Sequence, residues 1–186
     1  VVGFALGITA TGNLQPTNKV TVSSELSGIA EAVYVDTNDE VKKGQEIAKL
    51  DTRKLNQQTE KTRATLAAAQ ARVNQSEATV RESAANLERF QELHKLSGGR
   101  TPSKAEMETA IAAADRAKAD LENLTAAVSG AKADLAANES DLSKAIIRSP
   151  VDGVVLTRSL EVGQTVAASF NAPELFLIAE DLRKME

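Results

Sequence analysis

Two long stretches of the sequence carry the hydrophobic pattern of a two-helix coiled coil. In residues 103–145, apolar side chains recur every seven residues, and a second set follows three positions further on. The two sets are Met107, Ala114, Leu121, Val128, Leu135 and Leu142, then Ala110, Ala117, Leu124, Ala131, Asn138 and Ala145. Residues 52–97 have a narrower seam of the same period, formed by Leu66, Val73, Val80 and Leu87 with Thr62, Ala69, Ser76, Ser83 and Phe90. This spacing predicts two helices that pack along a coiled-coil seam.

The positions of glycine and proline set the limits of these helices. Residues 52–97 contain neither, whereas the segment 97–102 (Ser-Gly-Gly-Arg-Thr-Pro) concentrates helix breakers. Ser103 and Glu106 then have the spacing of a capping box. So short a turn predicts an antiparallel hairpin with arms of about 65 Å. We expect its distant turn to contact a partner, and the alternative is that the hairpin is only a spacer.

The two segments that flank the hairpin resemble each other. Residues 26–30 correspond to 151–155, and the same shift of 125 positions matches Asn38 with Gly163. Both of these turn residues tolerate positive φ, and a strand-like run precedes and follows each turn. We therefore expect two duplicated halves to close into one β-sandwich, with the hairpin as an insertion. Chance similarity between short β-motifs is the alternative.

Motifs in both flanks resemble the two halves of a biotinyl/lipoyl-type domain. The first is GI-x5-V-x2-ND-x-VKKGQ-x-IA-x-LD in residues 28–51, and the second is SPVDGVV in 149–155 with VGQTV in 162–166. Split around a coiled coil, these motifs resemble the membrane fusion protein (HlyD) family of periplasmic adaptors. Residues 9–16 (TATGNLQP) and 168–182 are most similar to the adaptors of macrolide-efflux ABC transporters.

The resemblance implies an α+β fold in which a long antiparallel α-helical coiled-coil hairpin is inserted into a split lipoyl-like β-sandwich, a barrel-sandwich hybrid. It also implies the domain limits, which are an N-terminal strand of a mostly missing β-barrel in 1–19, lipoyl-like halves in 20–51 and 147–180, the hairpin in 52–146, and the start of the missing β-barrel in 181–186. The implied function is that of a non-enzymatic periplasmic adaptor, anchored at the inner membrane and assembled as a homo-hexamer. It would link an inner-membrane ABC transporter, or an RND transporter, to a TolC-like outer-membrane channel.

The resemblance also implies which residues bind partners at the hairpin tip. The family's tip motif is Arg, three residues, Leu, six residues and Ser, and Arg89 and Leu93 match its first two positions. Because position 100 is Arg, the best counterpart of the serine is Ser103, three residues late. An Arg can donate several hydrogen bonds to a partner helix, and a Leu can fill its groove. The alternatives are a solvated Arg89 paired with a Glu, a Leu93 in the seam and a Ser103 that caps the second helix.

A second candidate site is the turn in the second lipoyl-like half. In a ring of subunits, this turn could face the lumen and narrow it. Its residues are Glu161, Val162, Gly163 and Gln164.

The amino-acid composition argues against several other functions. The chain of 186 residues has 22 Lys and Arg against 26 Asp and Glu, a formal charge of −4 without a basic block, so no nucleic-acid partner is expected. With no Cys and one His, we expect no metal site, no cofactor and no catalytic residues. No apolar run approaches the roughly 20 residues that span a bilayer. Because the chain starts with Val and stops in a charged string, we expect a fragment of a longer protein.

Two rival functions stay open from the residues alone. The first is a lipoyl or biotinyl carrier domain, with Lys54 as the modified lysine. A carrier needs that lysine on an exposed β-turn, whereas the residues around Lys54 run directly into the first predicted helix. The second rival is a purely structural coiled-coil scaffold, for which substitutions at the hairpin tip would change nothing.

Overall fold

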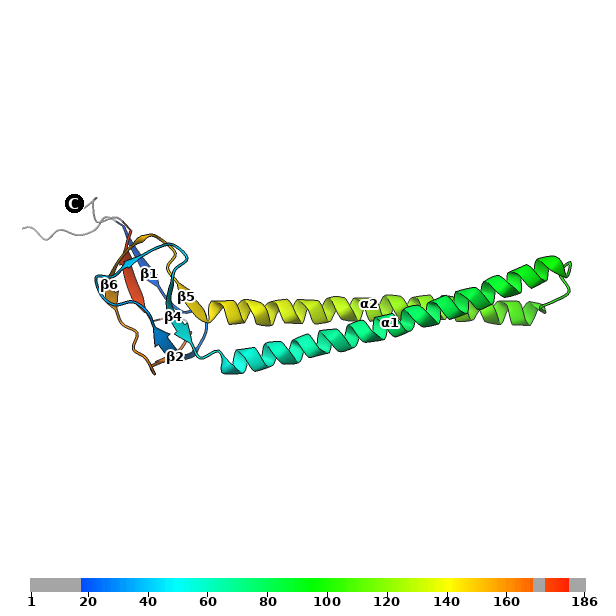
Figure 1. The fold of residues 1–186 in the computed structure, drawn as a ribbon, viewed down its shortest axis with the longest axis horizontal. Helices are drawn as coiled ribbons and strands as arrows, with labels where there is room; N and C mark the ends of the chain where they lie inside the picture. The colour runs from blue at the N-terminus through cyan, green and yellow to red at the C-terminus, as the bar shows by residue number, and fades with distance from the viewer. Residues whose placement is uncertain (1–17, 169–172, 181–186) are drawn as a thin grey trace, which may run out of the picture. The chain divides into compact units, whose positions relative to one another are not determined.

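The computed structural model describes residues 18–168 and 173–180 (Figure 1). The described chain divides into two compact units, one formed by residues up to 52 together with residues from 143 onward, the other by residues 53–142. The barrel strand expected in 1–19 therefore lies almost entirely outside the described residues, and so does the expected domain start in 181–186.

The second unit is a hairpin of two long helices, α1 (Arg53–Leu96) and α2 (Lys104–Lys144). Figure 1 shows them side by side and antiparallel. Every position of the two predicted seams is buried or half-buried, which confirms the heptad assignment. The seam is narrow because small side chains such as Ala114 and Ala117 occupy it. It is also partly polar, since Asn138 Nδ2 donates to Thr62 Oγ1 across it at 2.7 Å.

The first unit contains two four-stranded sheets. Their strands are β1 (Lys19–Val22), β2 (Gly28–Val33), β3 (Glu40–Val41), β4 (Glu46–Leu50), β5 (Ile146–Arg148), β6 (Gly153–Arg158), β7 (Thr165–Val166) and β8 (Phe176–Ala179). One sheet has the order β1-β8-β6-β3 and the other the order β5-β4-β2-β7. Each sheet therefore takes two strands from each side of the hairpin, so neither flank can complete a sheet alone. The predicted fold class, a helical hairpin inserted into a split β-sandwich, is confirmed.

The two halves of this unit are related by an approximate two-fold repeat. Exchanging β1 with β5, β2 with β6, β3 with β7 and β4 with β8 converts one strand order into the other. The repeat extends to individual hydrogen bonds. Asn38 N donates to Val155 O at 2.8 Å, and at positions shifted by 125, Gly163 N donates to Ala30 O at 2.8 Å. Asn38 and Gly163 also share a positive φ, 73° and 85°. The internal match read from the sequence is thus a match in structure.

The sheets enclose a core of aliphatic side chains and one aromatic ring. The largest fully buried side chains are Phe176, Ile47, Leu50, Leu160, Ile178, Val155 and Val166. They come from both halves, so the core depends on the halves closing together. Among the described residues, Phe176 is the aromatic side chain of this core.

The two glycines that begin β2 and β6 have different surroundings despite their equivalent positions. A Cβ on Gly153 would lie 2.1 Å from the carbonyl oxygen of Ala179, which belongs to the backbone of the neighbouring strand. A Cβ on Gly28 would lie 3.5 Å from the side chain of Leu50, an ordinary contact. Only the second half therefore requires glycine at this point.

This difference predicts unequal effects of the same substitution. Gly153→Ala should lower the free energy of unfolding of the β unit by about 3 kcal/mol, because β6 and β8 must separate to admit the methyl group. Gly28→Ala, the matched control, should change it by less than about 1 kcal/mol. Amide hydrogen exchange of β6 and β8 in both variants measures the effect. Equal protection in the two variants would contradict the close approach of Gly153 to β8.

Candidate partner-binding sites

The closed end of the hairpin is a turn held in one conformation by its own hydrogen bonds. Gly98 and Gly99 have positive φ, 62° and 84°, and Gly99 N donates to the carbonyl of His94 at 2.9 Å, which caps α1. The Ser97 hydroxyl donates to the carbonyl of Thr101 at 2.7 Å and accepts a hydrogen bond from Thr101 N at 3.0 Å. The side chains on this turn are therefore presented on an ordered backbone.

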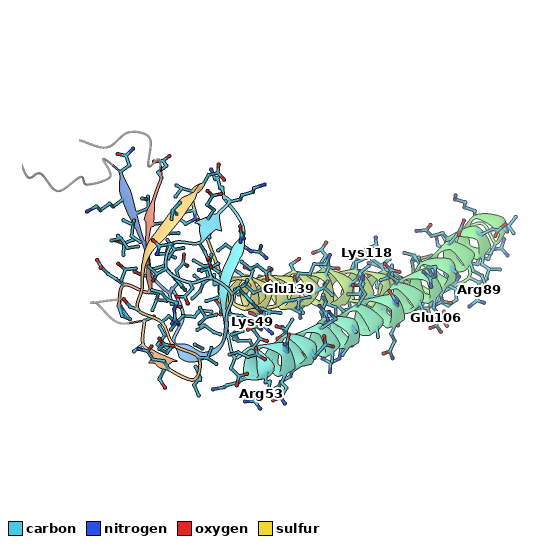
Figure 2. All side chains as sticks on the ribbon, turned by 60° about the vertical axis from the view of Figure 1, so that its left-hand side comes forward. Lys49, Arg53, Arg89, Glu106, Lys118 and Glu139 are labelled. Carbon is cyan, nitrogen blue, oxygen red and sulfur yellow. The ribbon has the colours of Figure 1, made fainter. Side chains whose placement is uncertain are left out.

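Arg89 and Leu93 lie one turn apart on α1, near this closed end. Arg89 Nη2 donates to Asn86 Oδ1 at 2.6 Å, and no carboxylate of the described residues forms an ion pair with it. Leu93 is 46% exposed, which is too much for a seam position and contradicts the alternative that Leu93 only packs inside the hairpin. Figure 2 shows Arg89 and Glu106 toward the closed end, with Lys118 further along α2. The side chains of Arg89 and Leu93 are thus both accessible to a partner.

Ser103 lies on the other side of the turn, as the N-cap of α2. Its backbone N donates to Glu106 Oε2 at 2.8 Å, and Glu106 N donates to the Ser103 hydroxyl oxygen at 3.3 Å. These reciprocal bonds confirm the predicted capping box. The pKa of Glu106 is lowered, first by the hydrogen bond from the backbone N–H of Ser103 and then by the one that the Ser103 hydroxyl donates to Glu106 Oε2 at 2.8 Å, while desolvation opposes the shift. Ser103 therefore has a structural role in the hairpin, whatever it contributes to a partner.

The second candidate site, the turn Glu161–Gln164, is exposed at all four positions. Glu161 N donates to Gln164 Oε1 at 2.9 Å, and Gln164 N donates to Glu161 O at 3.1 Å. The side-chain oxygen of Gln164 is thus occupied within the turn. Val162, 62% exposed, is the large apolar side chain that the turn presents to its surroundings. This turn and the hairpin tip belong to different units of the chain.

Sequence reasoning missed Arg158, which holds this turn in place. Its guanidinium binds both carboxylate oxygens of Glu161 at 3.0 Å, and its Nε donates to Asp36 Oδ1 at 3.1 Å. Asp36 and Glu161 are separated by 125 positions, the shift of the internal repeat. Acidic residues at equivalent positions of both halves were the signal that could have pointed to a shared cation. Arg158 therefore joins the equivalent turns of the two halves.

These contacts shift the pKa values of both partners. The pKa of Asp36 is lowered, first by the backbone N–H of Thr37, then by the hydrogen bond and charge of Arg158, while desolvation opposes the shift. The pKa of Arg158 is raised, with its hydrogen bond to Glu161 as the largest cause. Since both groups are charged at neutral pH, the bridge between the turns is intact there.

Within residues 18–168 and 173–180, no group of three or more His, Cys, Asp or Glu side chains is placed to hold a metal ion. In the same residues, neither long helix has a stretch apolar enough to cross a membrane. Lys54, the lysine of the carrier hypothesis, lies in the first turn of α1. A helical position does not provide the tight β-turn that a swinging-arm lysine needs.

A split β-sandwich interrupted by a long helical hairpin, with exposed side chains at its closed end, defines the class of membrane fusion adaptors. The chain belongs to the family described as "RND MFP, barrel-sandwich hybrid domain", which matches residues 18–177. This confirms the family resemblance found in the sequence. Proteins of this family are adaptors and not enzymes.

Named relatives support the similarity to macrolide-export adaptors. The chain is 31% identical over 173 residues to the macrolide export protein MacA of Yersinia pestis, covering 93% of this chain and 46% of that protein. It is 34% identical to the pyoverdine export membrane fusion protein PvdR of Pseudomonas putida, covering 93% and 43%. The crystal structure of MacA from Actinobacillus actinomycetemcomitans superposes with a TM-score of 0.84 at 30% identity, covering 96% of this chain and 54% of that one. The chain thus spans about half the length of these relatives.

The Arg158 bridge predicts a measurable pKa change. Because the folded pKa of Asp36 lies below its unfolded value, Asp36 stabilises the fold above the unfolded pKa, and this stabilisation is lost as the pH falls through the folded pKa. In Arg158→Gln, the pKa of Asp36 should rise but stay below its ordinary value, because the Thr37 N–H remains. An NMR titration of the Asp36 carboxyl carbon measures it.

The control for this experiment is Arg148→Gln. Arg148 pairs with Glu46 at 2.7 Å in the same unit, so its loss should leave the pKa of Asp36 unchanged. A pKa of Asp36 that responds equally to both substitutions would mean that Arg158 acts only through general charge.

Proposed function

We propose that the full-length protein is the periplasmic adaptor of a tripartite efflux or secretion pump, and that its hairpin tip binds a TolC-like outer-membrane channel. The observation that carries this proposal is the exposed pair Arg89 and Leu93, one turn apart on α1 at the closed end of the hairpin. Arg89 can donate hydrogen bonds to carbonyls or carboxylates of a channel helix, and Leu93 can enter the groove beside it. The family to which the chain belongs supports the same role.

The inner-membrane partner in this proposal is an ABC-type transporter. The support is the similarity to proteins named MacA, in sequence over 93% of the chain and in structure with a TM-score of 0.84. An RND transporter is the second candidate, because the matching family description contains that term. The proposed location is the periplasm, with an inner-membrane anchor in the full-length protein, and the proposed assembly is a homo-hexameric ring.

Within such a ring, the turn Glu161–Gln164 is proposed to face the lumen. Two observations support it. All four positions of the turn are exposed, and Arg158 binds the carboxylate of Glu161 at its start, so the turn is both accessible and tied to the β unit. It also presents an apolar side chain, Val162, where the equivalent turn of the first half presents Thr37.

Charge reversal at the tip tests the proposed channel contact. Arg89→Asp or Leu93→Asp in the full-length protein should abolish efflux, with a loss of at least about tenfold, because each places a carboxylate where a donor or an apolar side chain must dock. The helical circular dichroism should not change, since both side chains lie outside the seam. Efflux is measured as drug resistance of cells that depend on this protein.

Matched controls are Arg81→Asp, an exposed position of the same helix further from the tip, and Leu93→Met, which keeps an apolar side chain. Both should retain efflux. Full efflux in Arg89→Asp and Leu93→Asp would overturn the channel contact and would favour the structural-scaffold reading.

Enlarging the second-half turn tests its proposed place in the lumen. Val162→Trp should reduce transport by the full-length protein, because six copies of a larger side chain would narrow a central pore. The control is Thr37→Trp, the equivalent exposed position of the first half, which should leave transport unchanged. If Val162→Trp transports as well as the parent protein, the turn does not line the path of the substrate.

A further inference from the structure

The tip of the hairpin has a local charge opposite to that of the whole chain. Residues 93–105, between Glu92 and Glu106, contain Lys95, Arg100 and Lys104 and no Asp or Glu, although the chain has a net charge of −4. In the described residues, neither Lys95 nor Arg100 forms an ion pair. Lys104 reaches Glu108 only at 3.8 Å, and its side chain is 91% exposed.

Helix stability explains one of these cations but not the other two. Lys95 lies in the last turn of α1, where a positive charge interacts favourably with the helix dipole. Lys104 is the first residue of α2, where the same dipole makes a positive charge unfavourable. Arg100 lies between the two helices and belongs to neither. A charge that opposes local stability points to a function outside the fold.

An exposed leucine lies beside these cations. Leu96, the last residue of α1, is 79% exposed, the highest value among the large apolar side chains of the described residues. It lies one turn beyond Leu93, and Ile111 in α2 is also 42% exposed. Since the other three large exposed apolar side chains belong to the β unit, all those of the hairpin are close to its closed end.

Hydrogen bonds within the turn support the backbone that carries these side chains. The Ser97 hydroxyl holds both backbone groups of Thr101, as described above, and Arg100 lies within this hydrogen-bonded turn. A preformed turn loses little conformational entropy on association, so its exposed groups can contribute fully to affinity.

We propose that Leu96, Arg100 and Lys104 form a second contact with the channel, which fits a partner with an apolar recess and a rim of carboxylates. The two cations accelerate and orient the approach of the tip, and Leu96 enters the recess. This inference rests on the proposed function, because it names the chemistry of the channel surface. It adds three residues that the Arg89, Leu93 and Ser103 motif does not contain.

The test measures binding of the full-length protein to the purified outer-membrane channel of its own organism at several ionic strengths. Arg100→Gln/Lys104→Gln should lower the association rate constant about tenfold at low salt and flatten its salt dependence. Because Lys104→Gln also removes the contact with Glu108, thermal unfolding followed by helical circular dichroism checks that the double variant keeps the hairpin's stability. Leu96→Ser should accelerate dissociation about tenfold, and Leu96→Met should restore the parent rate.

The matched control is Lys118→Gln/Lys132→Gln, which removes the same charge from exposed positions of α2 outside the tip. It should retain the parent association rate and salt dependence. If Arg89→Asp abolishes binding but Arg100→Gln/Lys104→Gln does not alter it, this inference is overturned and the proposed function stands. Absence of any channel binding by the parent protein would overturn both. Salt-sensitive binding to vesicles of anionic phospholipid, without binding to the channel, would assign the cations to a membrane surface and overturn the inference.

Discussion

The structure depends on the pairing of β4 with β5, the two strands from which the hairpin departs and to which it returns. β4 ends at Leu50 and α1 begins at Arg53, while α2 ends at Lys144 and β5 begins at Ile146. The two strands form an antiparallel ladder, and Leu50 N donates to Ala145 O at 2.9 Å at its end. This ladder closes a loop of about ninety residues, whose entropic cost rises only slowly with length. The β unit can therefore accept a very long insertion, provided that the two ends of the insertion stay adjacent, as they do in an antiparallel hairpin.

The approximate two-fold repeat explains why the β unit closes, and the departures from it show where the unit is specialised. The repeat supplies reciprocal backbone bonds, such as those of Asn38 and Gly163, so each half completes the sheets of the other. At Arg158 the symmetry is broken, because the equivalent residue of the first half is Val33. The guanidinium of Arg158 binds two carboxylates, those of Asp36 and Glu161, which occupy equivalent positions of the repeat. A feature that only one half carries cannot be required by the shared strand pairing, so it is a reasonable place to look for function.

Much of this fold could be predicted from the sequence, because its determinants are local or periodic. Heptads, glycines and a capping box predicted the helices to within two residues at each end, and the shift of 125 positions predicted which strands are equivalent. The strand order could not be read in this way, since short strands pair through backbone groups that all residues share. The Arg158 bridge was also missed, because the equivalent positions of Asp36 and Glu161 do not indicate which cation lies between them. It required knowing that two turns far apart in the sequence lie close to one arginine.

The candidate site at the tip was predictable only in part, for a physical reason that concerns helix exposure. The resemblance to the family's tip motif pointed to Arg89 and Leu93, but whether Leu93 packs inside the hairpin or faces solvent depends on the course of the two helices. For Ser103, a partner contact is likewise not required to explain the residue, because its hydroxyl donates to Glu106 in the capping box. Ser103, three residues out of register with the family's motif, can therefore be explained by helix capping alone.

The small side chains of the seam leave the alignment of the two helices to polar contacts. Small residues such as Ala110 and Ala117 bury little surface, so apolar packing alone distinguishes poorly between neighbouring alignments of the two helices. The hydrogen bond from Asn138 to the buried Thr62 supplies that distinction, because any shift along the seam would leave these polar groups without each other. The ion pair of Arg63 with Glu139, one residue further along each helix, favours the same alignment. A polar pair near the strand-proximal ends of the helices thus fixes their register. That register determines which side chains of α1 and α2 lie beside the turn at the closed end of the hairpin.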